Sequence, residues 1–150
     1  MNNTFLSPCT GKLYSIDHFP DEIIADRVMG DGFMIELTDN EIVSPFDGIV
    51  KVVYPTGHAL CIESNDGISM MIHIGVDTFN IQGLNTTYVE VNDRVNTGDL
   101  LVKTDVKEMI KKTGNSACAF VFLNNEKVKD LKQDSVSCLD EIAKIEVGND

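Results

Sequence analysis

Two of the chain's three histidines stand on either side of a turn signal, at a spacing that could bring their imidazoles together. Fifteen positions separate His58 from His73, and Ser64-Asn65-Asp66-Gly67 lies between them. This tetrapeptide is typical of a β-hairpin turn. If an even-length loop is centred between Asn65 and Asp66, opposed residues sum to 131 and His58 faces His73. Opposed side chains have Cβ atoms about 4.5–5.5 Å apart, so the spacing predicts touching imidazoles.

Paired imidazoles in apolar surroundings suit phosphoryl transfer. A neutral histidine nitrogen can attack phosphorus near neutral pH without a strong base, and a second imidazole can donate a hydrogen bond to the developing charge. In the predicted register Leu60, Ile62 and Met71 share the face of the histidines, and with Phe79 they would exclude water. Thr56, two residues before His58, can fix the tautomer of that ring. The competing interpretation is a pair of structural histidines on one hairpin.

The hairpin belongs to a longer pattern of short strands that must position it. The predicted strands span 11–16, 32–37, 47–54, 58–63, 68–74, 87–91, 100–104, 117–123 and 143–147. They are rich in Val, Ile, Met, Phe and Tyr, and Gly, Asp, Asn or Pro separates most of them. Many short strands without alternating helices predict an all-β fold, an antiparallel β-sandwich with one or two short helices.

One helix is predicted after residue 104. Asp105 can cap its N-terminus, Val106, Met109 and Ile110 share a face, and Gly114 follows the last turn. At about two turns, it would cover one end of the core.

A weak internal repeat accompanies the strands. Ser7-Pro8-Cys9-Thr10-Gly11-Lys12-Leu13 matches Ser44-Pro45-Phe46-Asp47-Gly48-Ile49-Val50 as Ser-Pro-x-x-Gly-x-aliphatic. Each copy places a proline turn and a glycine just before a strand, so each is expected to open an equivalent corner of a sandwich with a duplicated motif.

Length and charge narrow the class of protein. A chain of 150 residues is one domain, residues 1–150, in which 1–6 would form a short N-terminal arm. The formal net charge of −12 disfavours binding to nucleic acid or anionic lipid and favours a basic protein partner. No run of about 20 apolar residues and no signal peptide is visible, and the four cysteines are widely spaced. These features predict a cytoplasmic protein with reduced thiols.

The motifs together resemble the glucose-type IIA domain of the bacterial phosphoenolpyruvate-dependent sugar phosphotransferase system. The resemblance covers roughly residues 7–125, in the order and spacing of the family. Its segments are Ser7-Pro8…Gly11, Pro20-Asp21, Gly30-Asp31-Gly32, Ser44-Pro45-Phe46-Asp47-Gly48, Thr56-Gly57-His58-Ala59, Ile62-Glu63-Ser64, His73-Ile74-Gly75-Val76-Asp77-Thr78 and Gly98-Asp99.

The resemblance implies a phosphocarrier with a shallow apolar depression. The histidine that matches His73 accepts a phosphoryl group on Nε2 from the carrier HPr and passes it to the IIB domain of a sugar permease. The histidine that matches His58 assists, and the threonine that matches Thr56 orients it. The residues that match the partner-docking rim, including two acids that meet the basic surface of HPr, are Ile23, Ile24, Tyr54, Met71, Phe79, Asp21 and Asp77. Tyr54 and Met71 stand where the family usually has Phe.

Other functions compete with this one. His58 and His73 could bind zinc weakly, and with Asp77 and an outside ligand could form a zinc hydrolase site, although the His-x-His pair of lysostaphin-type peptidases is missing. Asp77 is equally compatible with an ordinary turn acid. A swinging-arm carrier needs a lysine at an exposed hairpin tip, which no predicted hairpin offers. A regulatory module that binds partners without turnover is the remaining alternative.

Overall fold

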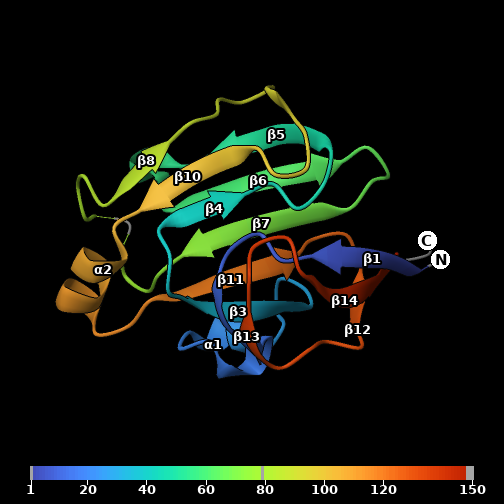
Figure 1. The fold of residues 1–150 in the computed structure, drawn as a ribbon, viewed down its shortest axis with the longest axis horizontal. Helices are drawn as coiled ribbons and strands as arrows, with labels where there is room; N and C mark the ends of the chain where they lie inside the picture. The colour runs from blue at the N-terminus through green and yellow to red at the C-terminus, as the bar shows by residue number, and fades with distance from the viewer. Residues whose placement is uncertain (1, 79, 148–150) are drawn as a thin grey trace.

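The computed structural model describes residues 2–78 and 80–147, which form three antiparallel sheets (Figure 1). The largest sheet has the order β13 (Asp134–Val136), β2 (Gly11–Ser15), β3 (Gly32–Leu37), β11 (Ala117–Phe122), β7 (Ser69–Ile74), β6 (Ala59–Ser64), β5 (Gly48–Val53), β9 (Arg94–Val95). The two smaller sheets are β1 (Asn2–Leu6), β14 (Glu141–Glu146), β12 (Lys127–Lys129) and β4 (Glu41–Val43), β10 (Leu100–Thr104), β8 (Asn85–Thr87). The predicted all-β antiparallel sandwich is confirmed.

The main core lies between the large sheet and the two small ones. Phe5 of β1 and Ile42 of β4 pack in one cluster with Phe33, Ile72 and Phe120 of the large sheet. The rings of Phe33 and Phe120 are stacked, with centroids 5.0 Å apart. Strands β3, β7 and β11 carry runs of buried residues because both of their faces are covered.

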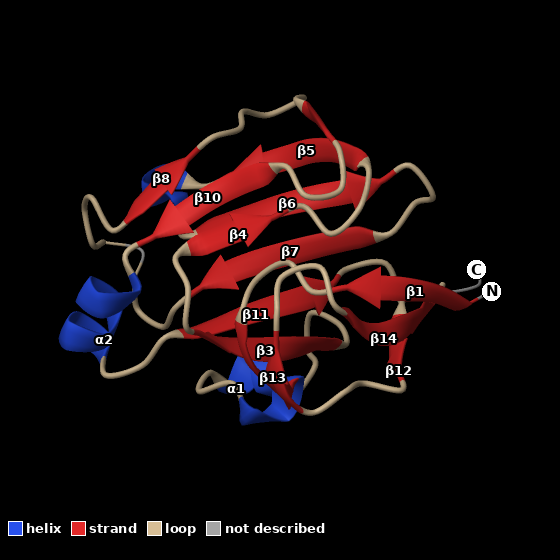
Figure 2. Cartoon of the chain, in the orientation of Figure 1, coloured by secondary structure: helices blue, strands red, loops and turns tan. Residues whose placement is uncertain are grey.

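A second apolar cluster covers the opposite face of the large sheet and is the one that borders the site. Ile16 and Phe19, from the 3-10 helix η1 (Ile16–His18) and the loop after it, pack with Ile24 of helix α1 (Glu22–Ala25) against Met71 and other sheet residues. Figure 2 shows α1 at the bottom of the view, below the large sheet, and α2 (Val106–Thr113) at the left. Sequence patterns did not predict η1 or α1.

The predicted repeat corresponds to two equivalent corners. The hydroxyl of Ser7 donates to the carbonyl of Cys9 at 2.6 Å, and that of Ser44 donates to the carbonyl of Phe46 at 2.6 Å. At the glycine of each copy, an added Cβ would lie 2.1 Å from a backbone oxygen of the neighbouring strand, Glu36 for Gly11 and Glu63 for Gly48. Close backbone approach therefore explains the repeated glycine.

Helix α2 forms where it was predicted. The Asp105 carboxylate accepts from the amide of Glu108 at 3.1 Å, and Gly114 closes the helix in the left-handed conformation at φ 84°. Val106 and Met109 are buried, whereas Ile110 is 48% exposed, so the apolar face is narrower than the sequence suggested. Within residues 2–78 and 80–147, no helix has the length and apolar character needed to cross a membrane.

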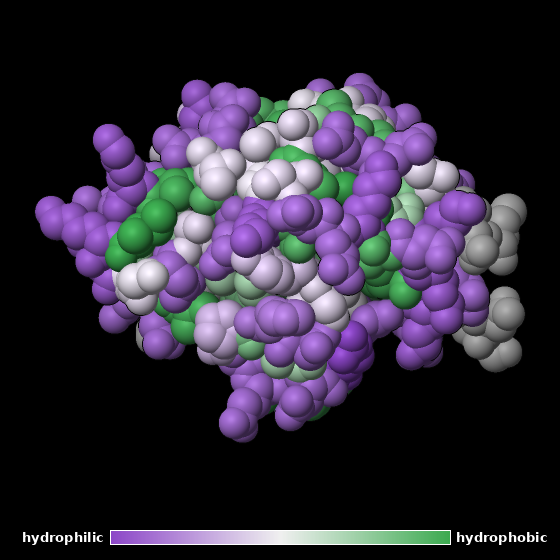
Figure 3. Space-filling model, turned by 60° about the horizontal axis from the view of Figure 1, so that its bottom comes forward, coloured by the Kyte–Doolittle hydropathy of each residue, from purple (hydrophilic) through white to green (hydrophobic). Residues whose placement is uncertain are grey.

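Eight of the nine predicted strands match observed ones within two residues. The predicted strand at 87–91 is wrong beyond its first residue, because only Thr87 belongs to β8. Five short strands were missed: β1, β4, β9, β12 and β13. Figure 3 shows a mainly hydrophilic face with hydrophobic residues gathered in small groups, as expected for a chain with net charge −12.

Candidate functional site

The hairpin that carries the histidines has a different register from the one predicted. Ala59, and not His58, pairs with His73, so opposed residues sum to 132. The amide of Ser64 donates to the carbonyl of Ile68 at 2.7 Å, which closes a three-residue loop, and Gly67 takes a positive φ of 92°. The prediction of an even-length loop was therefore wrong, because the glycine closes an odd-numbered loop.

The shifted register also changes which residues share the site face. Leu60 and Ile62 are fully buried in the main core, so the predictions that Leu60 shields the histidines and that both residues share their face were wrong. Ala59 and Cys61 take those positions, opposite His73 and Met71.

The two imidazoles nevertheless lie together. Their ring centroids are 5.9 Å apart and the planes cross at 79°. His58 precedes β6 and has helical backbone angles, at the end of the 3-10 helix η2 (Pro55–Gly57). Its carbonyl accepts from the amide of Ile74 at 2.7 Å, which ties it to the end of β7. Because His58 is not extended, the strand alternation that would have separated the rings does not apply to it.

Hydrogen bonding defines the tautomer of His73. Its Nδ1 lies 3.0 Å from the carbonyl oxygen of Gly75. A carbonyl oxygen only accepts, so Nδ1 carries the proton and, in the neutral ring, Nε2 carries the lone pair. The ring of Phe19 meets that of His73 edge-on, with centroids 6.2 Å apart.

His58 is held in the same tautomer. Its Nδ1 lies 2.9 Å from the carbonyl oxygen of Pro55 and 3.1 Å from Oγ1 of Thr56. Nδ1 therefore donates to Pro55, and Nε2 becomes a donor only when the ring takes a second proton. Thr56 has φ 65° and ψ 0°, which is unusual for a β-branched residue. The side-chain Nδ2 of Asn85 donates to the Thr56 carbonyl at 3.3 Å and holds this conformation.

Burial keeps His73 neutral. Desolvation lowers the pKa of His73 below its ordinary value, and the neighbouring His58 lowers it further, while the Gly75 carbonyl and Asp21 oppose the shift. The nucleophilic neutral ring therefore persists to lower pH than in a free histidine. As the pH drops below about 6.5, the unfolded chain binds a proton at His73 before the folded protein does. The free energy of unfolding therefore decreases between about pH 6.5 and the lower pKa of His73 in the folded protein.

The histidines lie in a shallow apolar depression of about 270 Å³. Ile23 and Tyr54 are exposed at 60% and 43%, whereas Ile24 and Met71 are almost fully buried beneath them. The full lining is Asp21, Ile23, Ile24, Met29, Tyr54, His58, Ala59, Met71 and His73. The predicted rim residues Ile23, Ile24, Tyr54, Met71 and Asp21 are thus brought together with both histidines.

One predicted rim residue, Asp77, is not among the residues that line this depression. Asp77 lines a different hollow, together with Asn80 and Lys112, and its predicted place at the edge of the depression stays a prediction. Phe79 lies outside the described residues.

Phe19 and Met29 were missed by the sequence reasoning. Phe19 is buried beside His73, and Met29, 42% exposed, lines the depression. Both belong to a stretch without helical or strand periodicity. The available signal was the pair Val28-Met29, large apolar residues among polar ones immediately before Gly30.

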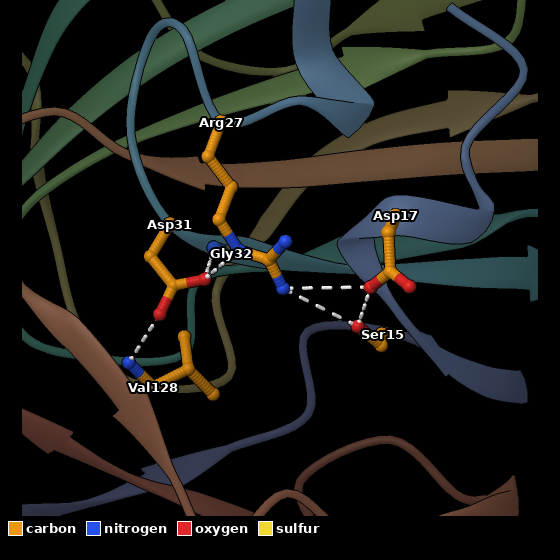
Figure 4. A network of polar contacts seen from close by, with 6 residues as sticks. All are labelled: Ser15, Asp17, Arg27, Asp31, Gly32 and Val128. Carbon is orange, nitrogen blue, oxygen red and sulfur yellow. Dashed lines mark hydrogen bonds and ion pairs between the residues drawn. The ribbon is translucent and has the colours of Figure 1, made fainter. Parts of the chain in front are cut away.

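A polar network fixes the segment that carries Ile23 and Met29 (Figure 4). Nε of Arg27 lies 3.0 Å from Oδ1 of Asp31, and the same guanidinium reaches Asp17 at 3.4 Å. The Asp31 carboxylate also accepts from the amides of Gly32 and Val128 at 2.9 Å each. Because Asp31 is anchored to β3 and β12, Arg27 connects the loop after α1 to the sheets.

Among the described residues, 2–78 and 80–147, no group of three or more His, Cys, Asp or Glu side chains is arranged to hold a metal ion. The two imidazoles alone would supply two nitrogen ligands, which is half of a tetrahedral zinc site.

Comparison with known proteins establishes the family. Residues 3–128 match the family model described as phosphoenolpyruvate-dependent sugar phosphotransferase system, EIIA 1. The chain belongs to this EIIA family. Members are phosphotransferase components that pass phosphoryl groups through a phosphohistidine, and this chain is accordingly a phosphocarrier of the sugar phosphotransferase system.

Individual EIIA relatives are similar over most of the chain. The glucose-specific EIIA component of Oceanobacillus iheyensis is 33% identical over 135 residues, which is 89% of this chain and 82% of that protein. The glucose-specific EIICBA component of Staphylococcus carnosus is 37% identical over 120 residues, 79% of this chain but only 18% of the larger protein. The glucose permease IIA structure from Mycoplasma capricolum superposes with a TM-score of 0.89 at 31% identity, over 96% of both chains.

Proposed function

We propose that Nε2 of His73 carries the phosphoryl group, received from HPr and passed to the IIB domain of a sugar permease. The observation that supports this best is the hydrogen bond from Nδ1 to the Gly75 carbonyl, 3.0 Å long, which assigns the lone pair to Nε2. That lone pair attacks phosphorus and forms the new P–N bond. The bond between phosphorus and its donor breaks, and its electron pair stays with the donor. The Nδ1 proton remains, and the Gly75 carbonyl faces the positive charge that develops on the ring.

His58 assists the transfer in this account. With its Nδ1 proton donated to Pro55, a second proton on the ring makes Nε2–H a donor towards phosphoryl oxygens on the neighbouring His73. Thr56 positions the His58 ring through the 3.1 Å contact between Oγ1 and Nδ1. The ring of Tyr54, whose centroid lies 5.8 Å from that of His58, supports the outer side.

We infer that both partners dock on the depression. Exposed Ile23, Met29 and Tyr54 provide apolar contact area around the histidines, and Asp21 adds a carboxylate beside them. The net charge of −12 favours encounter with a basic partner, so this proposal requires a basic docking surface on HPr. Because several relatives are named glucose-specific, we infer that glucose is the sugar served. We also infer that these partners meet in the cytoplasm.

The experiment that tests this function is incubation with phosphoenolpyruvate, enzyme I and HPr, followed by intact mass measurement. The expected product carries one phosphoryl group that survives base but not acid, as a phosphohistidine does. An unmodified mass, or an acid-stable phosphate, would contradict the proposal.

Replacing Arg27 is expected to weaken docking with little effect on folding. In Arg27→Ala the loop that carries Met29 loses its bonds to Asp31 and Asp17, so we expect KM for phosphorylated HPr to rise about threefold or more with kcat nearly unchanged. The ion pairs are partly exposed, so the free energy of unfolding should change by about 1 kcal/mol or less. Rapid-quench kinetics at several HPr concentrations measures the effect.

Lys103→Ala is the matched control for this prediction. Lys103 is 46% exposed, as Arg27 is, and pairs with Glu41 at 3.8 Å in another part of the molecule. The variant removes one positive charge but should leave KM unchanged. Equal KM changes in the two variants would show that the rise in KM comes from the loss of net charge, and would contradict a positioning role for Arg27.

We also propose that the unphosphorylated protein binds zinc weakly through Nε2 of His58 and His73, because both Nδ1 atoms are committed to carbonyl oxygens. Two ligands leave a tetrahedral site half filled, so the affinity should be low unless an outside carboxylate completes it. Calorimetry should show weak heats for the wild type that disappear when both histidines are replaced by Gln. Identical titrations of the two proteins would rule this out.

A further inference from the structure

We propose that the hydroxyl of Thr78 is a positioning group that keeps the proton of the His73 ring on Nδ1. This inference rests on the proposed role of His73 as the phosphorylated residue. Thr78 lies beyond the strand, five residues after His73, and acts through the turn between them. It is not expected to touch either partner, because its side chain is 1% exposed.

The first link is a hydrogen bond that bridges the turn. Oγ1 of Thr78 donates to the carbonyl of Ile74, the residue directly after His73. Such a bond from a threonine hydroxyl to the carbonyl four residues earlier closes one compact turn of backbone. Gly75, the second residue of this turn, supplies the carbonyl that accepts from Nδ1 of His73 at 3.0 Å.

The second link is packing against that glycine. Gly75 has φ 75°, and a Cβ added there would lie 2.5 Å from Cγ2 of Thr78 and 3.1 Å from Sδ of Met109. Thr78 and helix α2 therefore press directly on the glycine. The amide of Gly75 donates to the carbonyl of Ala117 at 2.9 Å, which fixes the other side. The hydroxyl bond to Ile74 holds the Thr78 side chain against Gly75, so the orientation of the Gly75 carbonyl depends on that bond.

The consequence concerns the state of the nucleophile. A neutral imidazole has its proton on one nitrogen, and only the ring with the proton on Nδ1 can attack through Nε2. If the Ile74–Thr78 bond is lost, the Gly75 carbonyl is less well held and part of the population takes the other tautomer. An ordinary hydrogen bond changes an equilibrium by about fivefold, which takes a ring predominantly protonated on Nδ1 to mixed protonation. We therefore expect kcat to fall by about twofold, in proportion to the fraction of His73 rings that lose the Nδ1 proton.

The test compares Thr78→Val with Thr78→Ser. Valine keeps the shape and loses the donor, whereas serine keeps the donor and loses the methyl group. Nitrogen-15 NMR of the imidazoles in the unphosphorylated protein should show His73 protonated on Nδ1 in the wild type and Ser variant, and mixed protonation in the Val variant. In phosphoryl transfer, Thr78→Val should lower kcat about twofold, in step with the Nδ1-protonated fraction and without changing KM for HPr, and Thr78→Ser should retain most of the activity.

Thr104→Val is the matched control. Thr104 is also 1% exposed, and its Oγ1 has no hydrogen-bond partner in the described structure, so removal of this hydroxyl should leave the tautomer of His73 and kcat unchanged. If the Thr78→Val variant does not fold, Thr78→Ala removes the same donor without adding bulk.

The outcomes separate this inference from the proposed function. An unchanged His73 tautomer in the Val or Ala variant, or an equal change in the Ser variant, would overturn the role of the hydroxyl. Failure of the wild type to be phosphorylated on His73 would overturn the proposed function instead. The NMR comparison would still decide what Thr78 does, because it uses unphosphorylated protein.

Discussion

The His73→Gln variant is expected to take up no phosphoryl group from phosphorylated HPr. Glutamine retains a polar side chain that can still donate to the Gly75 carbonyl, but it has no nucleophilic ring nitrogen. The hydrogen bond to Gly75 is therefore kept while the reacting nitrogen is lost. The loss of phosphorylation should exceed that caused by any other single change at the site. Intact mass measurement after incubation with phosphoenolpyruvate, enzyme I and HPr gives the occupancy directly.

His18→Gln is the control for loss of a histidine as such. His18 is exposed on η1, where its ring lies 5.5 Å from that of Tyr14 and away from the depression lining. This variant should be phosphorylated to the same extent as the wild type. Complete phosphorylation of the His73→Gln variant would exclude His73 as the carrier residue.

The His58→Gln variant should separate the two halves of the transfer. The nucleophile remains, so the variant should still accept a phosphoryl group from HPr. Passage to the IIB domain should slow by roughly 10² or more, because the charge that develops on the phosphoryl oxygens loses its imidazole donor. Mixing the isolated phosphorylated variant with the IIB domain, and following loss of the phosphoryl group with time, measures that step alone.

Thr56→Val provides a graded comparison for His58. It removes the hydroxyl near Nδ1 of His58 but leaves the carbonyl of Pro55, so a smaller decrease in the same step is expected.

Wild-type rates of transfer to IIB in His58→Gln would show that the second imidazole has no part in the chemistry, despite the 5.9 Å separation of the two ring centroids.

Local features of the fold were predictable where one residue type settles the conformation. Asp105 and Gly114 bound helix α2 because a carboxylate caps free amides and glycine tolerates a positive φ. The duplicated Ser-Pro turns were predictable from their repeated glycine, where an added Cβ would lie 2.1 Å from a backbone oxygen of the neighbouring strand. The short strands that the sequence did not reveal, such as the two-residue β9, have too few residues for a pattern.

Much of the site's membership was predictable from the sequence, but its geometry was not. The prediction brought His58 and His73 together through an even-length loop, whereas Gly67 closes a three-residue loop and His73 pairs with Ala59. The rings meet because His58 leaves the strand in a helical conformation after the left-handed Thr56. A β-branched residue at positive φ is held by tertiary contacts, so no local sequence pattern predicts this conformation.

The central claim is that the phosphoryl group resides on Nε2 of His73, and one measurement tests it most directly. NMR of the phosphorylated, nitrogen-15-labelled protein identifies the ring nitrogen bonded to phosphorus and the nitrogen that retains a proton. We predict a phosphorus bond to Nε2 of His73, with Nδ1 still protonated towards the Gly75 carbonyl that lies 3.0 Å away. A phosphorus bond to Nδ1 of His73, or to either nitrogen of His58, would contradict the proposed mechanism.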